Sequence, residues 1–468
     1  MNRKVRSILA GLLVLALVSL ACGISIPSGA TIDNAATAVA GTVNALAGTA
    51  ESLITAIPHD LTVTASPDDA LPTLPPVVEV APLRVSFSAP DGSLYTWAEG
   101  MGSALQLVGP EDICCSYVSP DGSMIAFTRY VDYQFVSLEV INSDGSNRHS
   151  LLDAVSIAEI PLPEGAVGTE TSQIVWLPGS HTLAVQMRNT FEGPGLFNNS
   201  NLFLFDAVSG ERSTLLNTGT NTWQMVWSPD GSKVAISNPE GIGIYSSEGD
   251  LIDESVLVYP FVNTASEYAW TAYPIWGTNN STLMAQVPPQ DPFFATGVDG
   301  YSSVWRVEAD GLSGEMTFQG PMQYRIGGDS GISPDLTKMA YIAPMDPPVE
   351  NTYNLVVSNV DGTGSTVAAN GQFMFDPVWA ADSAHYLYGL GNLPSVTAYI
   401  GQAGGVPSEV MDYHNPVGGK WVDATRYLVV TNNAGRWQLL LGTIGAPTGM
   451  IYDSVSASTN PINFSVNR

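Results

Sequence analysis

Charge is scarce in this sequence, and positive charge is the scarcest kind. Of its 468 residues 13% are charged, and 16 Lys and Arg stand against 44 Asp and Glu, so the formal net charge is −28. Binding to the phosphates of nucleic acids requires clustered Lys and Arg, and we therefore expect no nucleic-acid partner. An acidic surface of this kind favours solubility outside the cell.

Histidine and cysteine are also few, with five and three residues. The histidines are far apart in the chain and none forms an H-E-x-x-H pair, which argues against a zinc site. The G-x-S-x-G, phosphate-binding, dinucleotide-binding and calcium-loop patterns are absent as well. The segment Gly328-Asp329-Ser330-Gly331 is superficially protease-like, but no His can be assigned as its partner, so a Gly-rich loop is favoured. We expect no metal, no cofactor and no catalytic motif that is local in sequence.

The N-terminus carries an apolar run, Ile8–Ala21, that is too short for an ordinary membrane span. The positively charged residues Arg3, Lys4 and Arg6 precede this run. A charged start followed by a short apolar stretch is typical of a signal peptide. The sequence therefore predicts an export signal over residues 1–21.

Cys22 directly follows the small residue Ala21, and this junction resembles the bacterial lipoprotein signal. The resemblance implies that Cys22 becomes the lipidated first residue of the mature protein, anchored at the outer face of the cell membrane. The usual pattern has Leu three residues before the cysteine and a small residue two before it, whereas this sequence has Ser19 and Leu20. A plain secretory signal with an unmodified Cys22 is the alternative.

Residues 22–83 are predicted to form an anchor and stalk. Apolar residues recur at alternating steps of four and three from Ile32 to Ile57, which is a heptad pattern that ends before Pro58. A helix over residues 32–57 is one interpretation. An Ala/Thr-rich flexible stalk is the other, because two glycines weaken the helix. The Pro- and Thr-rich stretch that follows is typical of an extended spacer.

Glycine and proline are abundant, with 45 and 32 residues, and they mark a repeated turn. The stretch WSPDGSKVAI, which begins at Trp227, has six relatives in the chain. They are VSPDGSMIAF at Val118, WLPGSHTLAV at Trp176, WGTNNSTLMA at Trp276, ISPDLTKMAY at Ile332, WAADSAHYLY at Trp379 and WVDATRYLVV at Trp421. The copies begin 42 to 58 residues apart, which is the spacing of propeller blades.

Each copy predicts a hairpin for a physical reason. Pro presets the turn, Asp bonds to the backbone two residues on, and a glycine such as Gly231 accepts positive φ. Asp121, Asp230 and Asp335 share this turn position, so bonding to the backbone explains them better than metal binding. The tryptophan that ends the preceding strand is predicted to plug the core, and these residues are Trp176, Trp227, Trp276, Trp379 and Trp421.

A second hairpin follows each copy, as in NLFLFDAVSGERSTLL from Asn201. Two hairpins give four antiparallel strands, which form one blade. A single blade is unable to bury both of its faces alone. The faces become buried when neighbouring blades pack against them in a closed ring. The sequence therefore predicts an all-β fold, a β-propeller of four-stranded blades over residues 84–468.

The turn from Trp227 to Ala235 resembles the TolB-type propeller repeat, a WD-repeat-like pattern also found in the N-terminal propellers of dipeptidyl-peptidase-like hydrolases. The resemblance implies the fold of residues 84–468 and little about function, because the matching residues are blade architecture. In TolB, a six-bladed propeller follows a small α/β domain. In the peptidases, a hydrolase domain follows the propeller. This sequence shows neither, so neither specific function carries over.

The two ends of the repeat region predict the number of blades. Residues 84–108 supply three strands and lack an innermost one, and Ile462–Val466 is one spare strand. If the spare strand completes the first blade, the ring has eight blades and is closed by its C-terminal strand, which is the arrangement we favour. Seven blades with a loose N-terminal hairpin is the alternative.

Strand order separates two faces of the ring. The repeated turns and the second Gly-containing turns lie on one face, here called the repeat-turn face. The loops from second to third strand and from blade to blade lie on the other, the long-loop face. Loops on a rigid scaffold commonly carry binding sites. The candidate binding residues on the long-loop face are Tyr130, Tyr133, Phe191, Phe293, Phe294 and Tyr301.

Phe293 and Phe294 are the predicted anchors for a partner. Prolines beside them limit the entropy that is lost when the loop becomes ordered. Two adjacent aromatic residues in an extended loop do not both point inward, which leaves one for an interface. The alternative is that both fold back as a local hydrophobic plug.

Cys114 and Cys115 are adjacent in a predicted strand. Adjacent cysteines are able to close a strained vicinal disulfide. Two small buried strand residues is the interpretation that we favour.

The function that these observations predict is a non-catalytic scaffold at the cell surface, which binds other envelope or extracellular proteins or a ligand that the sequence does not identify. The rival hypothesis is a hydrolase or lyase whose polar groups converge on the channel from several blades and so leave no local motif. A His with two or three carboxylates in hydrogen-bond reach at the channel mouth would favour the enzyme.

Overall fold

The computed structural model describes most of the predicted propeller. The described residues are 81–132, 134–192, 197–216, 224–264, 268–291, 297–309, 314–323, 331–405, 407–409, 415–454 and 460–467. The predicted signal, Cys22 and the predicted helix over 32–57 lie outside these residues. The chain divides into two units, Met1–Val78 and Glu79–Arg468, and the fold described below is that of the second unit.

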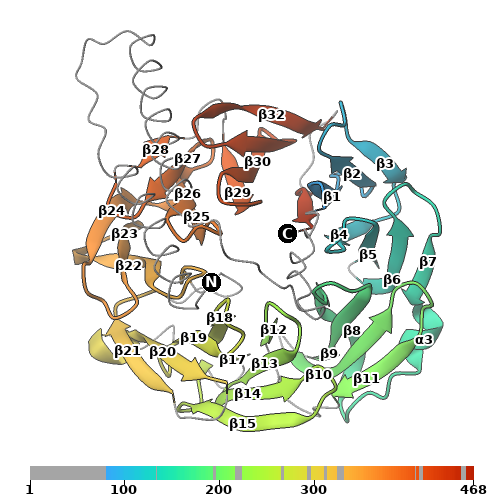
Figure 1. Ribbon diagram of the computed structural model, residues 1–468, viewed down its shortest axis with the longest axis horizontal. Helices are drawn as coiled ribbons and strands as arrows, with labels where there is room; N and C mark the ends of the chain where they lie inside the picture. Colours follow the sequence, from blue (N-terminus) through green and yellow to red (C-terminus); the bar gives the residue numbers. More distant parts are fainter. Residues whose placement is uncertain are drawn as a thin grey trace, which may run out of the picture. The chain divides into compact units, whose positions relative to one another are not determined.

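Eight antiparallel sheets follow one another around a ring in the order of the sequence (Figure 1). In seven of them the chain runs from the innermost strand outward, and the outermost strand leads to the next blade. The first blade differs, because its innermost strand comes from the C-terminal end of the chain.

The first four blades have four strands each. Blade 1 consists of β33 (Asn463–Val466), β1 (Arg84–Ser88), β2 (Leu94–Ala98) and β3 (Leu105–Val108). Blade 2 consists of β4 (Ile113–Val118), β5 (Met124–Val131), β6 (Gln134–Asn142) and β7 (His149–Leu152). Blade 3 consists of β8 (Ala166–Trp176), β9 (Thr182–Phe191), β10 (Phe197–Asp206) and β11 (Arg212–Leu216). Blade 4 consists of β12 (Gln224–Trp227), β13 (Lys233–Asn238), β14 (Gly241–Ser246) and β15 (Leu251–Val258).

The second half of the ring continues this order. Blade 5 consists of β18 (Tyr273–Trp276), β19 (Thr282–Val287), β20 (Ser302–Glu308) and β21 (Glu315–Gly320). Blade 6 consists of β22 (Lys338–Val349), β23 (Thr352–Asn359) and β24 (Thr366–Gly371). Blade 7 consists of β25 (Phe373–Trp379), β26 (His385–Asn392), β27 (Ser395–Gln402) and β28 (Ser408–Glu409). Blade 8 consists of β29 (Pro416–Trp421), β30 (Arg426–Asn433), β31 (Arg436–Thr443) and β32 (Ala446–Asp453).

Four short elements lie in the connections between these strands. They are the helix α3 (Ala154–Ala158), the 3-10 turn η1 (Gly297–Gly300) and the paired strands β16 (Asn263–Thr264) and β17 (Tyr268–Ala269). In blade 6, Ile332 pairs with Met339 as an isolated bridge at the place where the other blades have their innermost strand.

The C-terminal strand closes the ring. β33 pairs antiparallel with β1, and the register places Val466 opposite Val85 and Asn463 opposite Ser88. The predicted eight-bladed ring is therefore confirmed, and the alternative of seven blades is wrong. The N-terminal hairpin is not loose, because β33 covers the edge that β1 would otherwise expose.

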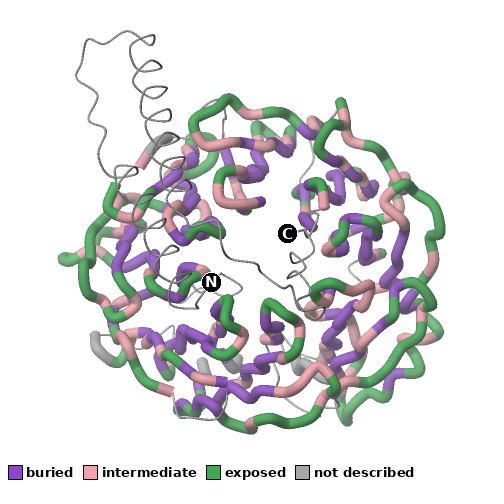
Figure 2. The backbone as a smooth tube through the Cα atoms, in the orientation of Figure 1, coloured by how far each residue is buried: buried purple, intermediate pink, exposed green. Residues whose placement is uncertain are grey.

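The repeated tryptophans end the innermost strands and are buried in the core. Their relative exposures are between 5% and 8%, for Trp176, Trp227, Trp276, Trp379 and Trp421. Figure 2 shows that buried segments alternate with partly buried ones along the strands, while exposed segments gather at turns and in outer strands. The apolar clusters join residues of neighbouring blades, so each interface between blades is part of the core.

Four of these tryptophans also bond to the preceding blade. The indole Nε1 donates to a backbone carbonyl oxygen one residue before the matching position of that blade. The pairs are Trp176 with Tyr117 at 3.0 Å, and Trp276 with Val226, Trp379 with Gly331 and Trp421 with Val378, each at 2.8 Å. Trp227 is the exception, because its Nε1 is buried and has no hydrogen-bond partner among the described residues.

We expect the Trp276→Phe variant to be less stable than the Trp227→Phe variant. Both changes remove the same atoms from a buried site, but only the first removes a hydrogen bond, the one to the Val226 carbonyl oxygen. The difference in the free energy of unfolding is expected to be about 1–3 kcal/mol, measured by urea denaturation of both variants. Equal losses of stability would contradict a contribution from the indole hydrogen bond.

The Asp residues of the repeated turns bond within their own turns. Each Oδ1 accepts the backbone N–H two residues on, at 3.0 Å, in the pairs Asp121 with Ser123, Asp230 with Ser232 and Asp335 with Thr337. The turns also bond to the next blade around the ring. Asp230 N donates to Asn280 Oδ1 at 3.0 Å, and Asp335 N donates to Ser383 Oγ at 2.9 Å.

Gly231 occupies the left-handed position of its turn, which in other blades is held by Asn280, Leu336 and Ser383, also at positive φ. The φ of Gly231 is +73°, and a Cβ there would lie 3.1 Å from Pro178 Cδ of the preceding blade. Any other residue would therefore be strained and crowded at this position. The turn thus approaches its neighbour as closely as the backbone allows.

Cys114 and Cys115 differ from our expectation. Both lie in β4, as expected. However, both are half-buried, whereas we expected them to be fully buried. Neither is in a disulfide. The reason is a register shift in β4, where Ile113 pairs with Arg129 and Cys115 pairs with Thr128, so that Cys114 is an extra residue at the start of the innermost strand.

Candidate functional site

The two faces of the ring carry different kinds of connection, as strand order predicts. The turns from β4 to β5 and from β6 to β7 lie on the repeat-turn face, and the turn from β5 to β6 lies on the long-loop face. The same alternation holds in the other blades. Each face has one cavity described below.

The structure describes three of the six candidate binding residues. Tyr130 is the second-last residue of β5, Phe191 ends β9 and Tyr301 precedes β20, which places all three on the long-loop face. Each is half-buried. They belong to blades 2, 3 and 5 and are not brought together. Tyr133, Phe293 and Phe294 lie outside the described residues, so the anchor and plug alternatives for the Phe pair stay open.

A cavity of about 590 Å³ opens on the long-loop face where the ring closes. We call it the closure pocket. It is lined by the turn between β1 and β2, the start of β4, the end of β5 and the approach to β33, with the residues Ser88, Ala89, Pro90, Asp91, Gly92, Asp112, Ile113, Cys114, Tyr130, Asp132, Asn460, Pro461 and Asn463. Its volume is within the range of small-molecule and peptide side-chain sites.

The wall of the closure pocket is held by backbone contacts between blades 1 and 2. Ile113 N of blade 2 donates to the Gly92 carbonyl oxygen of blade 1 at 3.1 Å, and Glu111 N donates to the same oxygen at 3.2 Å. Within blade 2, Tyr130 N donates to the Asp112 carbonyl oxygen at 3.1 Å. A Cβ at Gly92 would lie 3.0 Å from Asp112 N, so glycine is required for this close approach. These contacts fix the position of the neighbouring acidic residues.

The closure pocket is acidic. Asp91, Asp112 and Asp132 are exposed at its rim, and none of its lining residues is Lys or Arg. No ion pair joins these three carboxylates to a basic residue in the part of the chain that the structure describes. The negative charge of the site is therefore available to a ligand.

Tyr130 gives the pocket its aromatic wall. Its ring packs against Phe135 with a centroid distance of 5.6 Å. Burial, together with the nearby charge of Glu170, raises the pKa of the Tyr130 hydroxyl to about 12, so it stays protonated. The site thus offers an uncharged phenol beside carboxylates.

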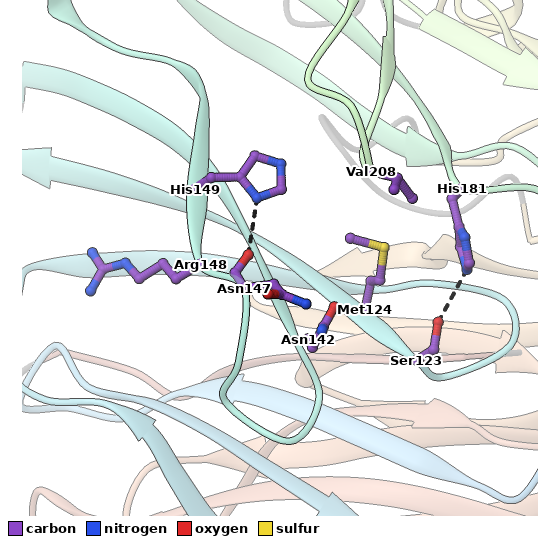
Figure 3. A pocket seen from close by; sticks show the side chains of 8 residues that line it. All are labelled: Ser123, Met124, Asn142, Asn147, Arg148, His149, His181 and Val208. Carbon is purple, nitrogen blue, oxygen red and sulfur yellow. Dashed lines mark hydrogen bonds between the residues drawn. The ribbon is translucent and has the colours of Figure 1, made fainter.

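The second cavity lies on the repeat-turn face between blades 2 and 3 and has a volume of about 500 Å³ (Figure 3). We call it the turn pocket, and it is lined by Ser123, Met124, Asn142, Asn147, Arg148, His149, His181 and Val208. His149 Nδ1 lies 3.0 Å from the Asn147 carbonyl oxygen, within its own turn.

Arg148, the arginine that lines the turn pocket, is ion-paired with carboxylates. Arg148 forms ion pairs with Glu111 and Glu139, each at 2.7 Å. The hydrogen bond to Glu111 raises the pKa of Arg148, and the same bond lowers the pKa of Glu111. Arg148 is therefore already paired with two carboxylates and is not a free anion receptor.

Ser123, His181 and Asp121 lie together but are not arranged as a catalytic triad. Ser123 Oγ lies 3.1 Å and Asp121 Oδ2 lies 3.0 Å from the same ring nitrogen, Nε2 of His181. A triad needs the hydroxyl and the carboxylate on opposite ring nitrogens, so that one orients the base for the other. The contact instead joins the turns of blades 2 and 3. His385 likewise pairs with one carboxylate, that of Asp382, at 2.6 Å in its own turn.

Metal-binding clusters and membrane-spanning helices are absent from the described ranges, 81–467 with the gaps given above. No group of three or more His, Cys, Asp or Glu side chains there is placed to hold a metal ion. Nor does any helix in those ranges have the length and apolar character needed to cross a membrane.

No family model matches the sequence, and no curated protein matches it. Similar solved structures include the β-propeller domain of the trilobed protease from Pyrococcus furiosus, at 13% identity over 74% of this chain and 98% of that chain, with a TM-score of 0.44. Others are oligogalacturonate lyase from Vibrio parahaemolyticus, at 11% identity over 66% and 83% with a TM-score of 0.47, and a putative TolB from Agrobacterium tumefaciens, at 14% over 57% and 98% with a TM-score of 0.35.

The order and pairing of its own strands make this protein an eight-bladed β-propeller. TolB proteins are among the similar structures, as the resemblance of the repeat predicts. The likeness is one of fold, and the neighbours include enzymes as well as TolB.

Proposed function

We propose that the protein is an exported, lipid-anchored binding protein of the cell envelope and that it has no catalytic activity. Its closure pocket receives a cationic group of another envelope or extracellular protein. The observation that supports the proposed binding site is the closure pocket itself. It presents Asp91, Asp112 and Asp132 with no basic residue in its lining, on a chain with a net charge of −28. Negative potential in a cavity attracts cationic partners and disfavours anionic ones.

The rigidity of the site also supports binding. Part of the lining comes from the turn between β1 and β2 and from the start of β4, which backbone hydrogen bonds join, so less order has to be gained there when a partner docks. Asp112 and Asp132 have φ of 57° and 49°, a left-handed conformation that Asn tolerates as well as Asp. Asp-to-Asn changes therefore remove charge without straining these turns.

The test is capture from envelope extract by the full chain and by a triple variant with Asp91→Asn, Asp112→Asn and Asp132→Asn. We expect the variant to bind the captured partner roughly tenfold more weakly, because each exposed charge contributes about 0.2–1 kcal/mol. The affinity of the purified partner is then measured at two salt concentrations. Salt is expected to weaken binding to the unaltered chain more than binding to the variant.

The matched control removes the same number of charges from the repeat-turn face, with Asp144→Asn, Asp206→Asn and Asp361→Asn. These carboxylates accept N–H groups of their own turns, and the Asn oxygen is able to accept the same bonds. The control is expected to retain capture. If the two triple variants bind alike, or if only the control loses its partner, the proposed site is wrong.

A further inference from the structure

The two adjacent cysteines of blade 2 have an arrangement that a regular strand does not allow. Successive side chains of a strand point to opposite faces, which keeps adjacent thiols apart. The extra residue in β4 changes this, and Cys114 Sγ lies 2.7 Å from Cys115 Sγ. Both thiols are free and each residue keeps part of its surface exposed. The bulge thus brings two reduced sulfurs into contact.

The surroundings of the two residues differ. The Cys115 thiol interacts with the hydroxyl groups of Thr128 and Tyr117 in the same blade. Cys114 contributes to the lining of the closure pocket. Its carbonyl oxygen accepts Ser88 Oγ at 2.6 Å and Asn463 Nδ2 at 3.0 Å, which fixes the backbone of the bulge against blade 1. Cys115 is anchored inside the sheet, and Cys114 borders the cavity.

The contact between the thiols gives them different pKa values. The hydrogen bond from Cys115 lowers the pKa of the Cys114 thiol to about 7. The same bond, together with burial, raises the pKa of Cys115. Near neutral pH Cys114 therefore carries the larger share of thiolate, the form that attacks disulfides.

We propose that Cys114 and Cys115 form a redox-active vicinal dithiol that exchanges with low-molecular-weight disulfides, with Cys114 attacking and Cys115 resolving. In the first step the Cys114 thiolate attacks one sulfur of the small disulfide R–S–S–R. A Cys114–S–S–R bond forms and one R–S⁻ leaves. In the second step the Cys115 sulfur, having lost its proton to solvent, attacks Cys114 Sγ. The second R–S⁻ leaves, and both leaving groups take up protons as R–SH.

The product is a disulfide between neighbouring residues, and this makes the couple reversible. Cα atoms of adjacent residues are about 3.8 Å apart across a trans peptide, whereas disulfides usually join Cα atoms about 4.4–6.8 Å apart. A ring forced outside that range is strained and easily reduced, which is typical of exchanging disulfides and not of structural ones. The only other cysteine of the sequence is Cys22.

The charge around the pair selects the kind of disulfide. Asp112 and Asp132 lie at the rim of the cavity that Cys114 lines, and the whole chain has a net charge of −28. An approaching anion is repelled and a cation is attracted. The preferred class of substrate is therefore a cationic small disulfide, for which cystamine is the probe, and oxidised glutathione is the anionic comparison. This chemistry does not depend on the proposed function.

The experiment uses the full chain with Cys22→Ser, so that Cys114 and Cys115 are its only thiols. It is exposed to cystamine, then alkylated and analysed by intact mass and peptide mapping. We expect the two-thiol protein to lose two hydrogens without a lasting adduct, and to regain them with dithiothreitol. Cys115→Ser is expected to stop at a cysteamine adduct on Cys114. Cys114→Ser is expected to react roughly tenfold or more slowly.

The selectivity for cationic disulfides is tested by comparing two probes and by removing the nearby negative charges. Oxidised glutathione is expected to react roughly tenfold more slowly than cystamine, and Asp112→Asn with Asp132→Asn is expected to narrow that ratio. If the Cys115→Ser variant has a lowered melting temperature, Cys115→Ala is used instead, and it is likewise expected to stop at the adduct on Cys114. A lasting adduct on the two-thiol protein, or equal rates for the two single-thiol variants, would overturn the proposal. So would thiols that stay unreacted under conditions that oxidise a free dithiol.

Discussion

Deletion of residues 461–468 is expected to cost the propeller a large part of its stability, because it removes the strand that closes the ring. Ile462 and Val466 are buried in one cluster with Leu83, Val85 and Phe87. β33 also bonds to the next blade, since Ser465 Oγ accepts the Val118 N–H at 2.9 Å. Without β33, β1 would present an unpaired edge above an opened core.

The loss is expected to be on the order of 5 kcal/mol, because Ile462, Val466 and the partly buried Phe464 are returned to water at about 1.5–3 kcal/mol each. Whole domains are stable by only about 5–15 kcal/mol, so a marked fall in melting temperature follows. Calorimetry of the full chain and the truncated chain measures it. A matched truncation that removes Arg468 alone is expected to melt like the full chain. If the longer deletion also melts unchanged, β33 does not hold the ring closed.

The Cys22→Ser change is expected to move the protein from the membrane fraction to the soluble fraction. We propose that Cys22 carries the lipid, on the basis of the charged start, the apolar run Ile8–Ala21 and the small residue before the cysteine. Acyl chains contribute about 0.8 kcal/mol of membrane affinity per buried CH₂ group, so their loss removes the anchor. Fractionation of cells that express each form, with the mass of the mature N-terminus, gives the readout.

Cys115→Ser is the matched control for this experiment. It replaces a cysteine by serine in the propeller and is expected to leave the protein in the membrane fraction. If Cys22→Ser also stays there, or the unaltered N-terminus has no lipid mass, the anchor is wrong. A soluble unaltered protein would support the plain secretory signal.

Most of the fold was predictable from the sequence, because the repeat is a local signal. The turn residues and the tryptophans stand at constant places in each hairpin, so innermost strands such as β8, β12 and β18 end at the predicted residues Trp176, Trp227 and Trp276. The closure by β33 was predictable because one strand was missing at one end of the repeats and one was spare at the other.

The candidate site was much less predictable. The closure pocket draws on segments around Asp91, Asp112, Asp132 and Asn460, which are far apart in the chain and have no common pattern. Of the three candidate aromatic residues that the structure describes, only Tyr130 lines it. Loop length and composition pointed to the long-loop face, where the closure pocket lies, but which loops meet in a cavity depends on the close packing of two blades, which no local stretch encodes.

The bulge at Cys114 was also beyond prediction. A strand of the sequence ICCSYV predicts alternating faces, and a one-residue shift depends on the partner strand β5. The exposure of the two cysteines and their contact both follow from that shift. A pair that looked like two buried small residues is therefore a pair of half-buried thiols in contact with each other.

The position of β1 inside its sheet has a mechanical consequence. The propeller begins with β1, and this strand lies between β33 on one side and β2 on the other. A pull along the chain from its N-terminal side therefore loads two ladders of hydrogen bonds at once, in shear. An outermost first strand would instead peel away one bond at a time. A propeller tethered through its N-terminus thus takes tension at a strand that has support on both sides.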